Sequence, residues 1–124
     1  MDTPENRAMG EEPRRPDYGE VLAALQRLEE ELRGLDLWEE QPPSAEAMAS
    51  RQPFHADTLA FEQWLQWIFL PRMRELARTG QPLPGPSRMA PMGEMSWRQR
   101  MNELQSLIDR LEVLDRLLSP QQDA

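Results

Sequence analysis

Residues 59–70 constrain the fold of this chain more than any other stretch. They read Leu-Ala-Phe-Glu-Gln-Trp-Leu-Gln-Trp-Ile-Phe-Leu and hold two of the four tryptophans and two of the three phenylalanines. On a helical wheel of about 100° per residue, their apolar side chains point in nearly every direction. Such a helix is enclosed by its own chain or spans a membrane. Because a span needs roughly 20 residues, we expect the central helix of a small core.

The composition bounds both the size of the protein and its chemistry. The chain has 124 residues, which is room for one domain. Cysteine and lysine are both absent, which excludes disulfides, zinc–thiolate sites and lysine nucleophiles. The N-terminus is polar and interrupted by prolines, so it predicts neither a signal peptide nor a membrane span. We therefore expect a cytoplasmic protein.

The net charge of −8 is unevenly distributed. Residues 1–46 carry thirteen acids and five arginines, residues 47–93 carry five arginines and three acids, and residues 94–124 carry four arginines and six acids. The acidity therefore comes mostly from the N-terminal third, while the middle segment is positive. A protein of this overall charge repels nucleic-acid phosphates, which disfavours direct nucleic-acid binding.

Helical periodicity marks an amphipathic helix at each end of the folded part. The first is expected to start at Asp17 as its N-cap and to end with Gly34 just beyond its last turn. The last is expected to be capped by Ser96 and to end before Pro120. Their apolar stripes are Tyr18, Val21, Leu25, Leu28, Leu32 and Leu35 in the first, and Trp97, Met101, Leu104, Leu107, Ile108, Leu111, Leu114 and Leu118 in the last.

Two further helix starts are expected between these stripes. Ser44 can cap a single turn at 45–49. Either Asp57 or Thr58 is expected to be the N-cap of the central helix, because both residue types accept hydrogen bonds from the first free backbone N–H groups.

Proline and glycine divide the rest of the chain. Pro71 removes one backbone hydrogen bond inside the central helical run, so we expect a kink there and not a stop. Gly80 is expected to end that run. Residues 80–95 contain four prolines and are expected to form a long irregular loop.

These patterns together predict an all-α fold. We expect a small helical bundle of three main helices plus one or two short helical turns, with the central helix kinked at a proline. A single domain is expected at 17–118, between a disordered acidic tail at 1–16 and a disordered tail at 119–124.

Several short runs resemble the signature of the YqcC-like family. They are 52–54, 57–59, 64–73, 81–84 and 90–91, and the Trp-Leu-Gln-Trp run leading into Pro-Arg-Met is the most specific. A looser match covers about residues 17–118. The resemblance implies a small all-helical bacterial protein from a family of uncharacterised function. Family members are often encoded beside an RNA pseudouridine synthase, which implies an accessory role.

Catalysis finds little support among the side chains. His55 is the only histidine, and Asp57 two residues later resembles the carboxylate that orients a base, but Asp57 is expected as a helix cap. The sequence has no Glu-x-x-His pair and no glycine-rich phosphate loop. We therefore expect a protein that is not an enzyme and that has no metal or cofactor.

The function we expect is that of a non-catalytic interaction or accessory protein with an unidentified protein partner. The candidate surface is the polar strip and basic end of the central helix, in the net-positive segment, where an acidic partner is attracted. Its residues are Glu62, Gln66, Arg72, Arg74 and Arg78. We also expect the Gln66 amide to bond a loop backbone, with 80–95 as the candidate loop.

The alternative is a helical bundle that binds a small molecule. Its pocket is expected between the Trp-rich central helix and the Pro-rich loop. The lining residues of this pocket are Phe54, Trp64, Trp67 and Met92, the last at a position where the YqcC-like family usually has an aromatic residue. Core packing of the two tryptophans is the competing interpretation.

Overall fold

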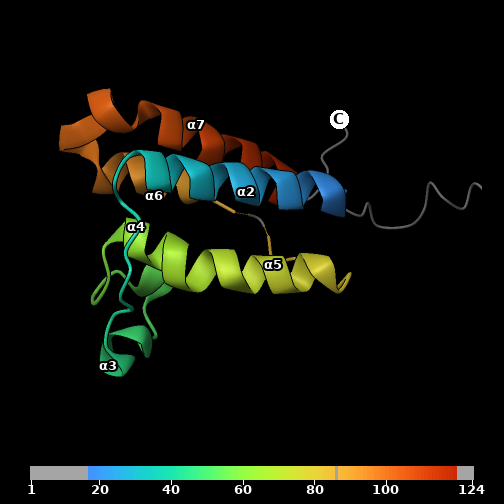
Figure 1. Cartoon of the computed structure of the whole chain (residues 1–124), viewed down its shortest axis with the longest axis horizontal. Helices are drawn as coiled ribbons and strands as arrows, with labels where there is room; N and C mark the ends of the chain where they lie inside the picture. The colour runs from blue at the N-terminus through green and yellow to red at the C-terminus, as the bar shows by residue number, and fades with distance from the viewer. Residues whose placement is uncertain (1–16, 86, 120–124) are drawn as a thin grey trace, which may run out of the picture.

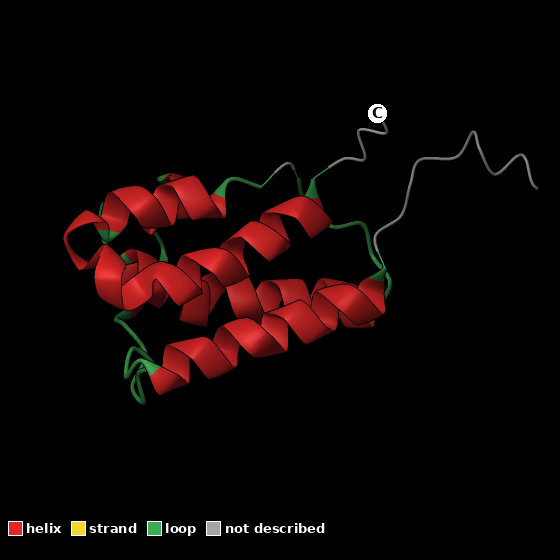
Figure 2. Ribbon diagram, turned by 90° about the horizontal axis from the view of Figure 1, so that it is seen from above, coloured by secondary structure: helices red, strands yellow, loops and turns green. Residues whose placement is uncertain are grey.

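The computed structural model describes residues 17–85 and 87–119, and every regular element within them is a helix (Figures 1 and 2). The all-α prediction is confirmed. In chain order the elements are α2 Tyr18–Gly34, α3 Ala45–Met48, the 3₁₀ turn η1 Pro53–His55, α4 Phe61–Trp64, the π-helical turn η2 Leu65–Phe69, α5 Leu70–Arg78, α6 Met89–Ser96, the 3₁₀ turn η3 Arg98–Arg100 and α7 Met101–Leu118.

The long helix α2 lies between α7 and the continuous run α4–η2–α5 (Figure 1). Helix α6 packs against α7 and also contacts α4. The apolar stripes of these helices meet in one core, whose buried side chains include Val21, Leu25, Leu28, Leu32, Phe61, Leu65, Phe69, Leu70, Met73, Met89, Trp97, Leu104, Leu107, Ile108, Leu111 and Leu114.

Both ends of α2 follow local capping rules. The Asp17 carboxylate accepts a hydrogen bond from the Glu20 N–H at 3.1 Å, so the predicted N-cap is confirmed. The predicted end is wrong by two residues, because Asp36 and not Gly34 takes the left-handed position beyond the helix. Gly34 is the last helical residue, and Asp36 adopts the left-handed conformation with φ 62°. The N–H of Leu37 then reaches back to the Leu32 carbonyl at 2.9 Å, which is a Schellman ending.

The short helix α3 is capped by Ser44, as predicted, through a 3.0 Å bond from the Ala47 N–H. The predicted caps of the central helix are wrong. Asp57 accepts a hydrogen bond from Ser50, and the Thr58 hydroxyl donates to the Ala47 carbonyl at 2.7 Å. Both residues thus fasten the loop onto α3 and its flank, and α4 begins later, at Phe61.

Pro71 is accommodated by the π-helical turn immediately before it. In this turn the Leu70 N–H bonds to the Leu65 carbonyl, one residue further back than in an α-helix. The helix continues through Pro71, the second residue of α5, to Arg78. Gly80 ends it, as predicted, with φ 70° and with the Gln81 N–H bonded to the Leu76 carbonyl at 2.9 Å.

The expectation of an irregular loop throughout 80–95 is wrong, because residues 89–96 form α6. Pro91 lies in the first turn of α6, where a missing N–H costs no intrahelical bond. Asp115 of α7 caps this helix from outside. Its carboxylate accepts from the N–H groups of Met89 and Ala90 at 2.9 and 2.8 Å and from the Ser87 hydroxyl at 2.6 Å.

The last long helix also starts later than predicted. Ser96 is the final residue of α6 and not a cap, Trp97 is buried in the connection, and η3 leads into α7 at Met101. Helix α7 ends at Leu118, in agreement with the prediction. The expected tail at 1–16, and residues 120–124 of the tail expected at 119–124, lie outside the described residues. In the part of the chain that the structure describes, none of the helices combines the length and apolarity that a membrane crossing demands.

Candidate functional site

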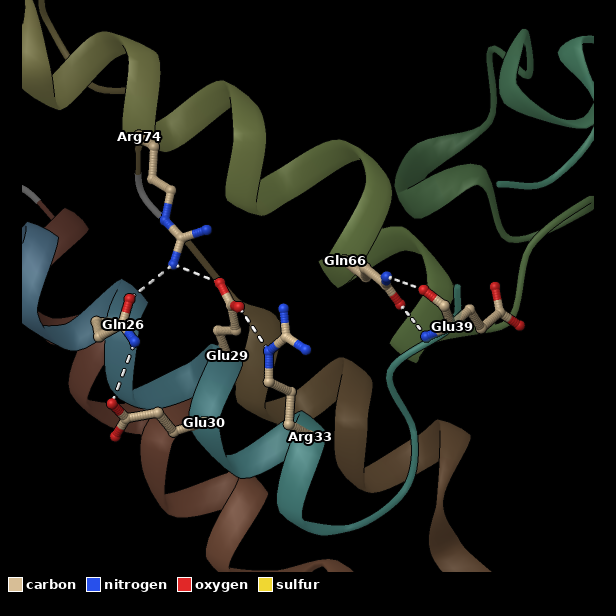
Figure 3. Close-up of polar contacts among 7 residues, drawn as sticks. All are labelled: Gln26, Glu29, Glu30, Arg33, Glu39, Gln66 and Arg74. Carbon is tan, nitrogen blue, oxygen red and sulfur yellow. Dashed lines mark hydrogen bonds and ion pairs between the residues drawn. The ribbon is translucent and has the colours of Figure 1, made fainter. Parts of the chain in front are cut away.

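The central run α4–η2–α5 has a polar side that faces the loop after α2. The buried Gln66 amide spans the backbone of Glu39, accepting from its N–H and donating to its carbonyl, each at 2.8 Å (Figure 3). The Glu39 carboxylate in turn accepts from the Gln63 amide and from the Trp67 indole N–H at 3.1 Å. This side of the helix is therefore occupied by the protein's own chain.

A second set of polar contacts joins α2 to α5. The Glu29 carboxylate bonds Arg33 at 2.7 Å and Arg74 at 2.8 Å (Figure 3). Burial raises the pKa of Glu29, but the hydrogen bonds from the two arginines outweigh this effect and hold its pKa below the usual value. Arg33 also lies over the Trp38 ring at 4.4 Å from its centroid, so the cluster fixes the end of α2.

Only some residues of the predicted partner surface are exposed and available to a partner. Gln66 is 4% exposed, so its place on that surface is wrong, and it bonds Glu39 instead of the 80–95 segment. Glu62 accepts from the Trp97 indole N–H at 2.8 Å, and Arg74 is bonded to Glu29. Arg72 and Arg78 remain exposed, with Arg78 paired to Glu75 on its own helix.

A cleft of about 470 Å³ opens on the other side of the central run. Its apolar lining comes mainly from η1, the central run, α6 and the end of α7. Its remaining lining comes from the loop before η1 and from the chain before α6. The lining residues include Arg51, Phe54, His55, Trp64, Ile68, Phe69, Arg72, Met73, Met89 and Leu118.

Two residues on the cleft wall have unusual backbone conformations. Phe54 and His55 are both left-handed, with φ of 58° and 51°, which costs about 1–2 kcal/mol for each such residue. Surrounding contacts hold them in place. The Phe54 and Trp64 rings meet edge-on, with 5.0 Å between their centroids. His55 Nε2 donates a hydrogen bond to the Met48 carbonyl at 3.0 Å. His55 and Asp57 thus bond different partners and do not form a base–carboxylate pair.

The cleft matches the predicted pocket in position and only partly in composition. Phe54 and Trp64 line it, while Met92 lines a shallower hollow beside Phe54, and Trp67 lies against Glu39. The sequence interpretation missed Ile68 and the cationic Arg51, whose exposure depends on how α6 and the preceding loop pack. Ile68 sits one turn after Trp64, and this spacing is the only signal in the sequence that could have included it.

Most of the chain matches one known protein family. Residues 20–117 match the family DUF446, whose description reads "tRNA pseudouridine synthase C". The chain belongs to the DUF446 family. Its relatives include an uncharacterized protein of Haemophilus influenzae, 41% identical over 93 residues, covering 75% of this chain and 87% of that protein. They also include the uncharacterized protein YqcC of Escherichia coli, 36% identical over 102 residues, covering 82% and 94%.

A solved structure of a relative supports the fold independently. The solution structure of YqcC from E. coli superimposes with a TM-score of 0.73 at 37% sequence identity, over 82% of this chain and 86% of that one. A third relative, a tRNA pseudouridine synthase C of Pectobacterium carotovorum, is 43% identical over 65 residues. That match covers 52% of this chain but only 17% of the relative. The resemblance to the YqcC-like family is thus confirmed.

Proposed function

We propose that this protein is a non-catalytic accessory protein that binds a tRNA pseudouridine synthase. The observation that carries the proposal is the Pectobacterium relative. Because 65 matched residues are 17% of that protein, it is about 380 residues long, about three times the length of this chain. A segment similar to about half of this chain is therefore a minor part of a longer chain that is named for pseudouridine synthesis.

The two shorter relatives supply the complementary observation. This chain covers 87% and 94% of their lengths, so the domain also occurs as a small separate protein. Within one chain, a linker keeps two modules at a high effective concentration without any strong interface. Separate chains lack that linkage, so an association between them requires a binding surface.

The exposed basic end of the central run supports one location for that surface. Residues 47–93 are net positive in a chain of charge −8, and Arg72 and Arg78 are exposed there. Arg74 and Gln66 are engaged within the protein and are left out of the proposed surface. An acidic patch on the enzyme is steered towards this end and away from the acidic N-terminal third.

The test is direct binding between the purified protein and the tRNA pseudouridine synthase C of the same bacterium. We expect a stoichiometric complex in calorimetry and sedimentation, together with a changed rate of pseudouridine formation in tRNA. The double variant Arg72→Glu/Arg78→Glu should bind more weakly, with the loss shrinking as salt rises.

The control is Arg98→Glu, which changes the net charge by half as much as the double variant does. Arg98 is exposed and lies in the turn between α6 and α7, at the opposite end of the bundle from the end of α5 (Figure 1). This variant changes the net charge by the same sign without touching the proposed surface. The absence of a complex at micromolar concentrations would refute the partnership. A complex that both variants weaken equally would retain the partnership but refute its location.

A further inference from the structure

The cleft beside Trp64 has an apolar floor that belongs to the core itself. Phe69, Met73, Met89 and Leu118 are buried and line it from the central run, α6 and α7. Half-buried Ile68 stands above this floor. The volume of about 470 Å³ lies within the range of roughly 300–1,000 Å³ that is typical of ligand pockets. The cleft is therefore large enough for a small molecule with an apolar body.

The charges along the cleft are of one sign. Its described lining contains Arg51 and Arg72 but no aspartate or glutamate, although the whole chain has 22 acids and 14 cations. No ion pair joins either arginine to another residue within 17–85 or 87–119. A guanidinium binds a carboxylate through paired, charge-assisted hydrogen bonds. These two arginines, which pair with no acid among the described residues, thus favour an anionic ligand.

One wall of the cleft is held in a strained conformation. Phe54 and His55 both line it and both have positive φ. Backbone strain of this kind persists where the surrounding structure enforces it, and it is concentrated at ligand-binding sites. The Phe54 ring packs against the rings of Phe61 and Trp64, at centroid distances of 5.5 and 5.0 Å. The aromatic wall is thus already formed before any ligand enters.

From these observations we propose that the cleft binds a small amphiphilic anion, a carboxylate with an apolar body. The apolar part packs on Phe69, Met73 and Met89, and the carboxylate pairs with Arg51 and Arg72. This site shares Arg72 with the proposed partner surface, but it rests on the cleft lining and needs no enzyme partner.

The test is titration of the purified protein with decanoate below its micelle concentration, followed by calorimetry and tryptophan emission. Decanol has the same chain without a charge, and decylamine carries the opposite charge. We expect saturable one-to-one binding of decanoate, weaker binding of decanol and none of decylamine. Arg51→Gln/Arg72→Gln should weaken decanoate binding about tenfold or more and leave decanol binding unchanged.

Two further variants make the result specific to the cleft. Arg98→Gln removes an exposed cation outside the cleft and should leave decanoate binding unchanged. Ile68→Trp adds volume at the cleft and should reduce the binding of both decanoate and decanol. The melting midpoint of each variant is measured first, and binding is compared among variants whose midpoint equals that of the wild-type protein. The proposal is overturned if decanoate does not saturate, if decanol binds as tightly as decanoate, if Arg98→Gln causes an equal loss, or if Ile68→Trp has no effect.

Discussion

The buried amide of Gln66 offers the sharpest test of how the central run is held. Gln66→Leu keeps a side chain of similar size at a position that is 4% exposed, but it removes both 2.8 Å bonds to the backbone of Glu39. A buried backbone group without a partner costs about 1–3 kcal/mol. Since Glu39 is only half-buried, we expect a total loss of about 2–4 kcal/mol. This is a large share of the 5–15 kcal/mol typical of a domain.

Urea denaturation monitored by circular dichroism measures this loss. The matched control is Gln105→Leu, the same change at an exposed site whose amide donates to Asp109 at 3.1 Å. Its effect should stay within about 0.5 kcal/mol. Equal stability of Gln66→Leu and the wild-type protein would refute the role assigned to the Gln66–Glu39 pair.

Gln66→Glu turns the same contact into a pH-dependent one. A protonated glutamic acid retains both an acceptor for the Glu39 N–H and a donor for its carbonyl, whereas the carboxylate has no donor. Burial raises the pKa of such a carboxyl in the folded state. The variant should therefore approach wild-type stability at acidic pH and lose stability as the pH rises through that raised pKa. A stability difference that is constant with pH would contradict the geometry.

Three further predictions concern other contacts. The pKa of Glu29 is lowered in the folded state, so the wild-type protein should be more stable than Glu29→Gln at any pH above the ordinary carboxyl pKa. This difference in stability should disappear as the pH falls through the lowered pKa of Glu29, as urea titrations at several pH values would show. Gly93→Ala places a Cβ 2.8 Å from Ile108 Cδ1 and should cost about 1–3 kcal/mol; the control Gly34→Ala meets no atom within 4 Å and should gain about 0.5–1 kcal/mol, both read from melting curves. Asp115→Ala should cost about 0.5–2 kcal/mol and speed hydrogen exchange at the first amides of α6, while unchanged exchange there would exclude the cap.

The parts of the fold that depend on neighbouring residues could be predicted from the sequence. The stripes of α2 and α7 repeat every three or four residues, and the caps Asp17 and Ser44 act on amides three residues away. Gly80 ends α5 for the same local reason. The failures are non-local. Helix α6 was missed because Pro91 and the three prolines before the helix suggest a loop, and because its cap, Asp115, lies 25 residues further along the chain than Ala90.

The candidate site divides in the same way. A glutamine on an apolar helix predicts a buried hydrogen bond, but nothing in the sequence identifies Glu39, 27 residues earlier, as its partner. Phe54 and Trp64 were expected in a pocket from their type and position. The contribution of Arg51 follows from the path of the loop before η1, and that path depends on long-range packing that residue spacing does not encode.

The π-helical turn changes how residues in this helix are to be counted. Phe61 and Met73 are both buried, yet twelve steps of about 100° would leave them about 120° apart around an α-helix. Eleven steps leave them only about 20° apart. The turn at 65–69 absorbs one residue, and this keeps the buried side continuous from α4 into α5. A homologous chain with a single-residue deletion here can therefore retain the same core, and a one-residue gap inside this helix is a structurally sound alignment.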